Sequence, residues 1–194
     1  MKLVELVKKS RSIRRFHTDI PVPAETLRAL IDLARCIPSA WNRQPLKYYI
    51  SNNAEKNALI YSNLVWPEFG NWREAAPEER PAAYILILGD TAIAAHFGVE
   101  AGIAAQTILL GAVEQGLGGC ILGQLNQEGL RASLRIPARY KILLLLALGY
   151  PAERSILEAP LENHNQDFWR DETGLVHVRK RPLDEILLTA FDEA

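Results

Sequence analysis

The spacing of apolar residues along the chain predicts alternating helices and strands. Residues 3–7 and 27–34 carry apolar side chains at helical spacing, and Pro23 suits the first turn of the second helix. That helix should end before Pro38, which restricts the residue preceding it to extended geometry. Residues 84–88 and 142–148 are uninterrupted apolar runs, each followed by glycine. Such runs are typical of central strands that are covered on both faces.

Weaker patterns predict the remaining elements. We expect strands at residues 47–51 and 120–123, a helix at 54–64, a long helix at 91–118 and a short helix from Asn126 to near Arg135. The polar and aromatic stretch after Pro151 has few periodic apolar positions until a last short helix begins at Pro182. The order of elements indicates an α+β fold, with a mixed central sheet flanked by helices, in one domain over residues 1–194.

Composition and charge exclude several classes of function. The chain has 194 residues, 48% of them hydrophobic, and a net charge of -1, so no general positive field attracts nucleic acid or anionic lipid. Cys36 and Cys120 form no disulfide framework, which favours a cytoplasmic location. The N-terminus has no secretory pattern. His96 and Glu100 interrupt the apolar stretch of the long helix, so we expect no membrane span there. We expect His96 to be a core histidine.

Two basic clusters suggest an anion site. Arg11, Ser12 and Arg14 offer two guanidinium groups and a hydroxyl, and a second cluster, residues 179–181, lies near the other end of the chain. Each cluster alone is more often a solvated face. Together they favour a phosphate site, and phosphate contacts alone bind weakly, so the ligand should carry a further planar or apolar group. This points to a nucleotide-like cofactor.

Other cofactor and catalytic patterns are absent from the sequence. There is no P-loop motif, and the glycines at residues 116–119 follow a helix and precede a strand, which is the reverse of a dinucleotide-binding turn. The histidines and cysteines have no zinc-site spacing, and no serine lies in a nucleophile elbow. We therefore expect no metal and name no catalytic side chain.

Two motifs in order carry a resemblance to a known family. R-S-I-R-R-F at residues 11–16 and P-S-A-W-N-R-Q-P at residues 38–45, followed by Gly118-Gly119, strongly resemble the nitroreductase family of FMN enzymes over nearly the whole chain. The resemblance implies an intertwined homodimer with two FMN sites at its interface. It also implies a C-terminal extension that wraps around the partner subunit.

The resemblance also implies which residues bind FMN. Arg11 and Ser12, with Arg179 and Arg181, would hold the phosphate, and Arg14 would approach the pyrimidine edge of the ring. The partner subunit would contribute a loop, and a strand end would lie along the isoalloxazine with a backbone N–H near Gly123 directed at N5 or O4. The loop residues are Pro38, Ser39, Ala40 and Asn42, and the strand residues are Cys120, Ile121, Leu122 and Gly123.

The activity implied is hydride transfer from NAD(P)H through FMN to nitroaromatic, quinone or related electron-poor acceptors. Two alternatives stay open. One is another flavin task, such as dehalogenation, enone reduction or flavin breakdown, and the other is flavin binding without turnover. The loop at residues 38–45 departs from the family pattern, because Trp41 and Arg43 replace small polar residues that are usual there. Leu46, just after the loop, replaces the usual aromatic residue. The candidates for a lid over the flavin are Trp41, Trp66, Trp72 and the polar segment around Phe168-Trp169, and core packing is the alternative for each tryptophan.

Overall fold

The computed structural model describes residues 1–65, 74–159 and 168–188. Contacts divide the chain into a first unit, Met1–Ala152, and a second unit, Glu153–Ala194. The sequence-based prediction of a single domain over residues 1–194 is not tested by this division. The candidate lid residues Trp66 and Trp72 lie outside the described residues.

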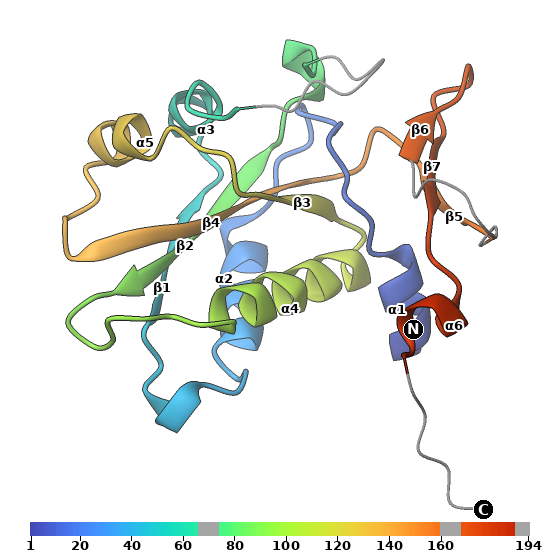
Figure 1. Cartoon of the computed structure of the whole chain (residues 1–194). Coiled ribbons are helices and arrows are strands. Elements are labelled where there is room, and N and C mark those ends of the chain that lie inside the picture. The colour runs from blue at the N-terminus through green and yellow to red at the C-terminus, as the bar shows by residue number, and fades with distance from the viewer. Residues whose placement is uncertain (66–73, 160–167, 189–194) are drawn as a thin grey trace, which may run out of the picture. The chain divides into compact units, whose positions relative to one another are not determined.

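The described part of the first unit contains helices, short 3-10 turns and the strands of one sheet (Figure 1). Strands β2 and β4 are the two apolar runs, and both extend beyond the predicted limits. The elements are α1 (Leu3–Lys9), α2 (Ala24–Ala34), η1 (Ala40–Asn42), β1 (Leu46–Ser51), α3 (Ala54–Tyr61), η2 (Pro77–Glu79), β2 (Ala83–Asp90), α4 (Glu100–Glu114), β3 (Gly118–Leu122), α5 (Gln127–Leu134) and β4 (Tyr140–Gly149).

The sheet of the first unit has the strand order β1-β2-β4-β3, and its neighbouring strands pair antiparallel. Strand β3 is therefore an edge strand. A parallel bridge between Ser12 and Gly119 adds the N-terminal segment to that edge, so the sheet is mixed there. The α+β class predicted from the sequence is confirmed.

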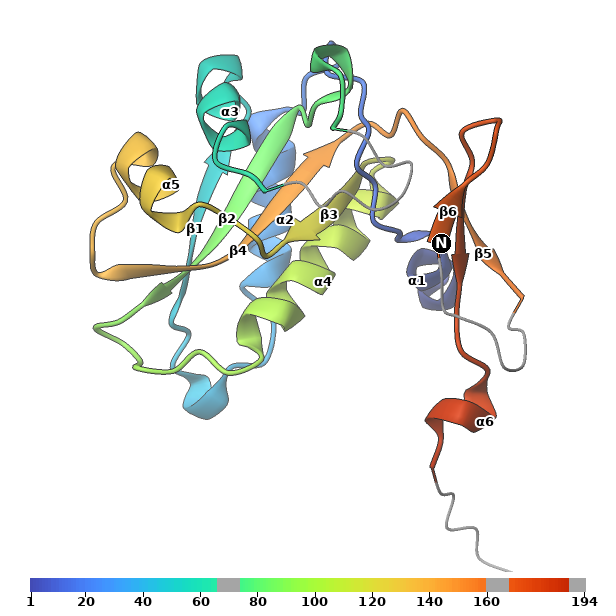
Figure 2. The same cartoon turned by 45° about the horizontal axis from the view of Figure 1, so that its top comes forward.

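Helices cover both faces of this sheet, as Figure 2 shows, with α2 and α4 on one side and α3 and α5 on the other. Successive side chains of a strand point to opposite faces. Ile85 and Ile87 accordingly pack in the core under α2 and α4, while Leu86 packs in the core under α3 and α5. Every residue of β2 is buried, which explains its uninterrupted apolar sequence.

The predicted helix over residues 91–118 is wrong in its first part, because α4 begins only at Glu100. The Asp90 carboxylate accepts a hydrogen bond from the Ala92 backbone N–H, which stabilises a turn after β2. Gly98 then has a φ of 49°, a left-handed conformation that does not continue a helix. His96 lies in this turn region and is exposed, so its prediction as a core histidine is wrong.

Close packing of α2 on α4 depends on Gly111. A Cβ atom at this position would lie 2.8 Å from a side-chain carbon of Leu33 and 3.0 Å from one of Leu30. Gly98 and Gly102 have no such role, because neither has a packed atom within 4 Å of the position of a Cβ. Buried alanines such as Ala105 and Ala112 complete the packed face of α4.

The second unit contains a small sheet that the sequence pattern did not predict. Its order is β5-β7-β6, with β5 parallel and β6 antiparallel to β7. Strands this short carry too few positions to show an alternating pattern. The expected last helix is confirmed as a short segment. The elements are β5 (Ser155–Glu158), β6 (Phe168–Arg170), β7 (Val176–Arg179) and α6 (Leu183–Ile186).

Candidate cofactor-binding site

The segment with the basic residues lies along the outer edge of β3. Ile13 and Phe16 are buried in the core, and the Ile13 backbone N–H donates a hydrogen bond of 3.0 Å to the Gly119 carbonyl. Glycine is required here, because a Cβ at Gly119 would lie 2.5 Å from the Ala147 carbonyl oxygen. A Cβ at Gly118 would lie 2.9 Å from the Ile13 side chain. Gly118 therefore lets the segment approach the strand, whereas Gly119 allows the close packing of β3 on β4.

Arg11 is the residue of this segment whose guanidinium retains an unused donor. Its Nη2 donates a 2.7 Å hydrogen bond to the Val7 carbonyl at the end of α1. Its Nε is buried and has no hydrogen-bond partner among the described residues. Burial lowers the pKa of Arg11 from its ordinary value, because removal from water disfavours the charged form. A buried N–H without an acceptor favours an anionic ligand.

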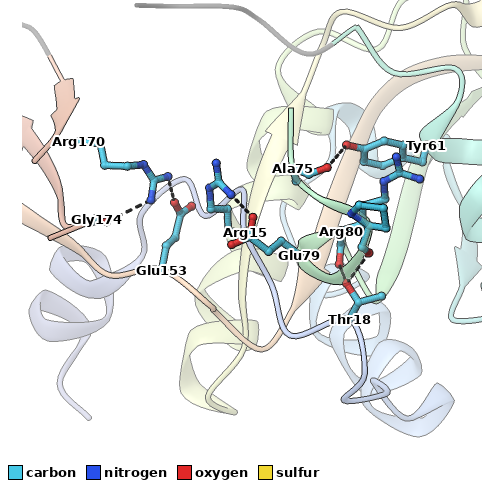
Figure 3. Close-up of polar contacts among 10 residues, drawn as sticks. Arg15, Thr18, Tyr61, Ala75, Glu79, Arg80, Glu153, Arg170 and Gly174 are labelled. Atoms are coloured by element: carbon cyan, nitrogen blue, oxygen red, sulfur yellow. Dashed lines mark hydrogen bonds and ion pairs between the residues drawn. The ribbon is translucent and has the colours of Figure 1, made fainter. Parts of the chain in front are cut away.

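The other cations of the segment are engaged to different degrees. Arg14 donates a 3.4 Å hydrogen bond to the Ser12 carbonyl, and Ser12 itself is exposed. Arg15 forms an ion pair with Glu79, so its charge is held away from the candidate site (Figure 3). The structure thus separates two of the neighbouring arginines, with a buried Nε on Arg11 that has no partner among the described residues and an ion pair at Arg15.

Strand β3 is the outer strand of the sheet, so some of its backbone N–H and C=O groups point away from β4. Alternate residues of a strand direct their N–H and C=O groups to the same edge. Because the Gly119 carbonyl faces outward, Ile121 faces outward too, and Gly123 lies one step beyond the strand. The side chains of Cys120 and Leu122 are buried in the core. By the same alternation, the backbone N–H and C=O groups of these two residues face β4, so the outer edge offers a cofactor the backbone of Ile121 and Gly123 instead.

The loop at residues 38–45 has a strained backbone. The backbone φ angles of Trp41, Asn42 and Gln44 are 55°, 52° and 51°. Residues other than glycine rarely adopt such positive φ angles. The Ser39 hydroxyl accepts a 2.8 Å hydrogen bond from the Gln44 backbone N–H, and the Ala40 N–H donates to Glu100. Residues held in such a conformation cluster at binding sites.

This loop and the basic segment lie at opposite ends of α4. Ala40 is bonded to Glu100, the first residue of α4, whereas Ile13 is bonded to Gly119, shortly after α4 ends at Glu114. The helix has 15 residues, and at about 1.5 Å per residue it separates the two groups by roughly 20 Å. Within one chain, the structure therefore does not bring them together.

Arg179 and Arg181 differ in their surroundings within the second unit. The Arg179 guanidinium carbon lies 5.1 Å from the centre of the Trp169 ring, and its Nε is buried without a partner among the described residues. Arg181 is exposed and forms an ion pair with Glu185. Arg179 therefore has a free donor for an anion, and the Arg181 charge is already compensated.

Sequence reasoning missed Glu100 as a residue of the site. It is buried, and its carboxylate anchors the candidate loop through the 3.0 Å bond from the Ala40 N–H. An acidic residue at the first turn of an apolar helix was the available signal. Among the described residues, no group of three or more histidine, cysteine or acidic side chains is placed to hold a metal ion. In the same part of the chain, no helix has the length and apolar character needed to cross a membrane.

Comparisons with known proteins indicate the family to which the chain belongs. The model of the Nitroreductase family matches residues 7–150. NADH dehydrogenase of Thermus thermophilus is 29% identical over 191 residues, which cover 84% of this chain and 93% of that protein. A solved Desulfovibrio desulfuricans structure in complex with FMN has a TM-score of 0.73 at 23% identity, and the match covers 100% of this chain and 99% of that one. Iodotyrosine deiodinase of Thermotoga neapolitana is 24% identical, covering 77% of this chain and 88% of that protein.

The family model spans well over half of the chain, including the basic segment, the strained loop and β3. The chain belongs to the nitroreductase family of oxidoreductases.

Proposed function

We propose that this protein binds FMN and passes hydride from NAD(P)H to nitroaromatic, quinone or similar electron-poor acceptors. The observation that carries the proposal is the buried Nε of Arg11, which has no partner among the described residues and lies next to the segment that pairs with the edge of β3. Two features of known proteins support it: the Thermus relative is named for NADH, and the Desulfovibrio structure contains FMN. The electron donor and the electron acceptor stay predictions. The cytoplasmic location is also a prediction.

The residues present fit a flavin mononucleotide. A phosphate group accepts several charge-assisted hydrogen bonds, and unused guanidinium N–H groups of Arg11 and Arg179 are donors of that kind. Ser12 is exposed and adds a hydroxyl, and Arg181 would contribute only after releasing Glu185. In this proposal the outward backbone of Ile121 and Gly123 would bind the ring.

FMN, when bound, would supply the hydride-transfer chemistry. The chain's own residues would bind and orient it. Arg14 would place positive charge at the pyrimidine edge, and the backbone N–H of Gly123 would be a neutral donor at the ring. Neither role requires a side chain that acts as a nucleophile or general base, so we assign no catalytic side chain.

The proposal includes a homodimer in which the partner's loop completes each site. One chain cannot bring its own loop and Arg11 to a single flavin, because α4 separates them. Two exposed apolar side chains lie at the start of α4: Val99, the residue before the helix, is 75% exposed, and Ile103 in its first turn is 37% exposed. Trp41, in the loop, is 90% exposed. Such a surface is typical of an interface. Pro38, Ser39, Ala40 and Asn42 would reach the flavin across it.

Purified protein tests the cofactor and the donor directly. We expect a yellow sample whose flavin absorbance is bleached by NADH or NADPH without oxygen and restored by a quinone or a nitroaromatic compound. Arg11→Ala combined with Arg179→Ala should release FMN into the filtrate, whereas Lys56→Ala should not. Colourless protein that FMN does not reconstitute would contradict the proposal, as would full FMN retention by the double variant.

A second candidate is reductive dehalogenation, favoured by the similarity to iodotyrosine deiodinase. It uses the same flavin site, so FMN binding does not distinguish the two. The distinguishing measurement compares reduction by NADH with reduction by dithionite. Flavin that dithionite reduces rapidly and NADH does not would favour this second task.

A further inference from the structure

A cavity of about 260 Å³ lies in the first unit between the start of β2 and the first turns of α3. Its wall includes apolar surface from Pro21, Pro81 and Ala58, together with Tyr61, Arg80 and Tyr84. None of these residues is among those assigned to the FMN site. A cavity of roughly 150 Å³ holds benzene, so this one has room for a substituted single ring.

The hydroxyl of Tyr84 is the most informative group in this wall. Tyr84 is fully buried, and its hydroxyl has no hydrogen-bond partner among the described residues. Burial raises the pKa of this phenol far above its ordinary value, and the Arg80 charge opposes this only in part. The hydroxyl therefore stays protonated and can donate. A buried donor without an acceptor is costly, and its presence beside a cavity favours a ligand with an acceptor atom.

Arg80 supplies a second free donor. Its guanidinium lies 4.1 Å from the centre of the Tyr61 ring, a stacked arrangement that fixes the group, and its Nε is buried without a partner among the described residues (Figure 3). Its Nη2 is 3.7 Å from the Glu74 carboxylate, a long and mostly exposed ion pair. Pairs of this kind contribute little, so an acceptor in the cavity can compete with Glu74.

The other polar side chains of the wall already have partners. The Asn57 amide nitrogen donates to the Ala82 carbonyl at 2.7 Å, and the Asn57 oxygen accepts from Ser51 at 2.7 Å. The Asn52 amide nitrogen donates to the Val22 carbonyl at 3.0 Å. The Thr18 hydroxyl donates to the Arg80 carbonyl at 2.6 Å. The groups that remain for a ligand are thus the donors of Tyr84 and Arg80.

We propose that this cavity is a second small-molecule site, separate from the flavin site, which binds a molecule of single-ring size through an oxygen acceptor, with a carboxylate preferred. The apolar wall would contact the ring, and Tyr84 and Arg80 would donate to the carboxylate. A hydrogen bond to a charged group is stronger than one between neutral groups. The preference for a carboxylate follows from the positive charge of Arg80.

Benzoate is the probe, with benzamide and toluene as neutral comparisons. We expect benzoate to raise the melting temperature of the FMN-saturated full-length protein in a concentration-dependent way, benzamide to act more weakly and toluene least. Titration calorimetry gives the affinity. Tyr84→Phe and Arg80→Gln should each weaken benzoate binding roughly tenfold to a hundredfold. Lys56→Ala, which removes an exposed cation from the same helix as Ala58, should leave it unchanged.

The stability of Tyr84→Phe without benzoate is the second measurement. Because the hydroxyl has no partner to lose among the described residues, this variant should melt at the same temperature as the wild type or higher. A marked loss of stability would show that the hydroxyl is already used structurally, and would overturn the proposal. So would benzoate binding that survives both variants and shifts the flavin absorption band, which would place the probe at the flavin. Absence of benzoate and benzamide binding would overturn it too.

Discussion

The backbone N–H of Ala40 donates a 3.0 Å hydrogen bond to the carboxylate of Glu100, a residue 60 positions later in the chain. This bond ties the strained loop at residues 38–45 to the first turn of α4. Glu100 is 8% exposed, so its carboxylate is largely removed from water. The relationship makes the position of the loop depend on a residue that is outside every recognisable motif.

Replacing Glu100 by alanine should loosen the loop. Glu100→Ala leaves the Ala40 N–H without its acceptor, and we expect a loss of about 1–2 kcal/mol in the free energy of unfolding, measured by denaturant titration. Glu100→Gln retains an oxygen acceptor and should lose less. Glu114→Ala, at the exposed far end of α4, serves as the control. Equal stability of Glu100→Ala and the wild type would show that the loop does not depend on this bond.

The exposed Ile103 side chain on α4 should affect the oligomeric state. Ile103→Glu places a charge where the proposed homodimer buries a side chain, so we expect a monomer by light scattering coupled to gel filtration. The same variant should lose FMN, because the partner's loop no longer reaches the site. Lys56→Glu on α3 should change neither property. A dimeric Ile103→Glu variant with full FMN content would rule out this face as the interface.

The two arginines near the C-terminus should contribute unequally to FMN binding. Arg179 has a buried Nε without a partner among the described residues, whereas Arg181 forms an ion pair with Glu185. Arg179→Ala should therefore weaken FMN binding by roughly tenfold or more, and Arg181→Ala by much less. Fluorescence titration of the apoprotein with FMN measures both. A larger effect of Arg181→Ala would reverse the assignment.

His177 should make the second unit sensitive to alkaline pH. Hydrogen bonds to Asp171 at 3.0 Å and to Glu158 at 2.6 Å raise the pKa of His177 above its ordinary value of 6.5. A raised histidine pKa stabilises the fold below the unfolded-state pKa, and this contribution is lost as the pH rises through the folded-state pKa. We therefore expect β5, β6 and β7 to be less stable at about pH 9 than at about pH 6.

An NMR titration of the imidazole measures this pKa directly. Glu158→Gln removes one charged acceptor and should lower the pKa of His177, while the bond to Asp171 remains. Trp169 stacks on His177 with a centroid separation of 4.7 Å, so its fluorescence reports the same change. An unshifted His177 pKa in the wild type, or no change in Glu158→Gln, would contradict the role of these carboxylates.

Much of the fold was predictable because local patterns and burial agree. The central strands were evident, since a strand covered on both faces is mostly apolar, as β2 is from residue 83 to residue 88. The helix at residues 91–118 was extended too far, because composition does not reveal the Asp90 turn that delays its start. The strands of the second unit were missed, because β6 has only three residues.

The sequence by itself determined the family and the residue types that the proposed site needs, since both motifs lie within short segments whose chemistry is readable position by position. Only the tertiary structure decided which members are free to bind. It paired Arg15 with Glu79, left the Nε of Arg11 without a partner among the described residues, and set the loop and Arg11 at opposite ends of α4. It also placed Tyr84 and Arg80 at one cavity. These relationships join residues far apart in the chain, and no local pattern encodes them.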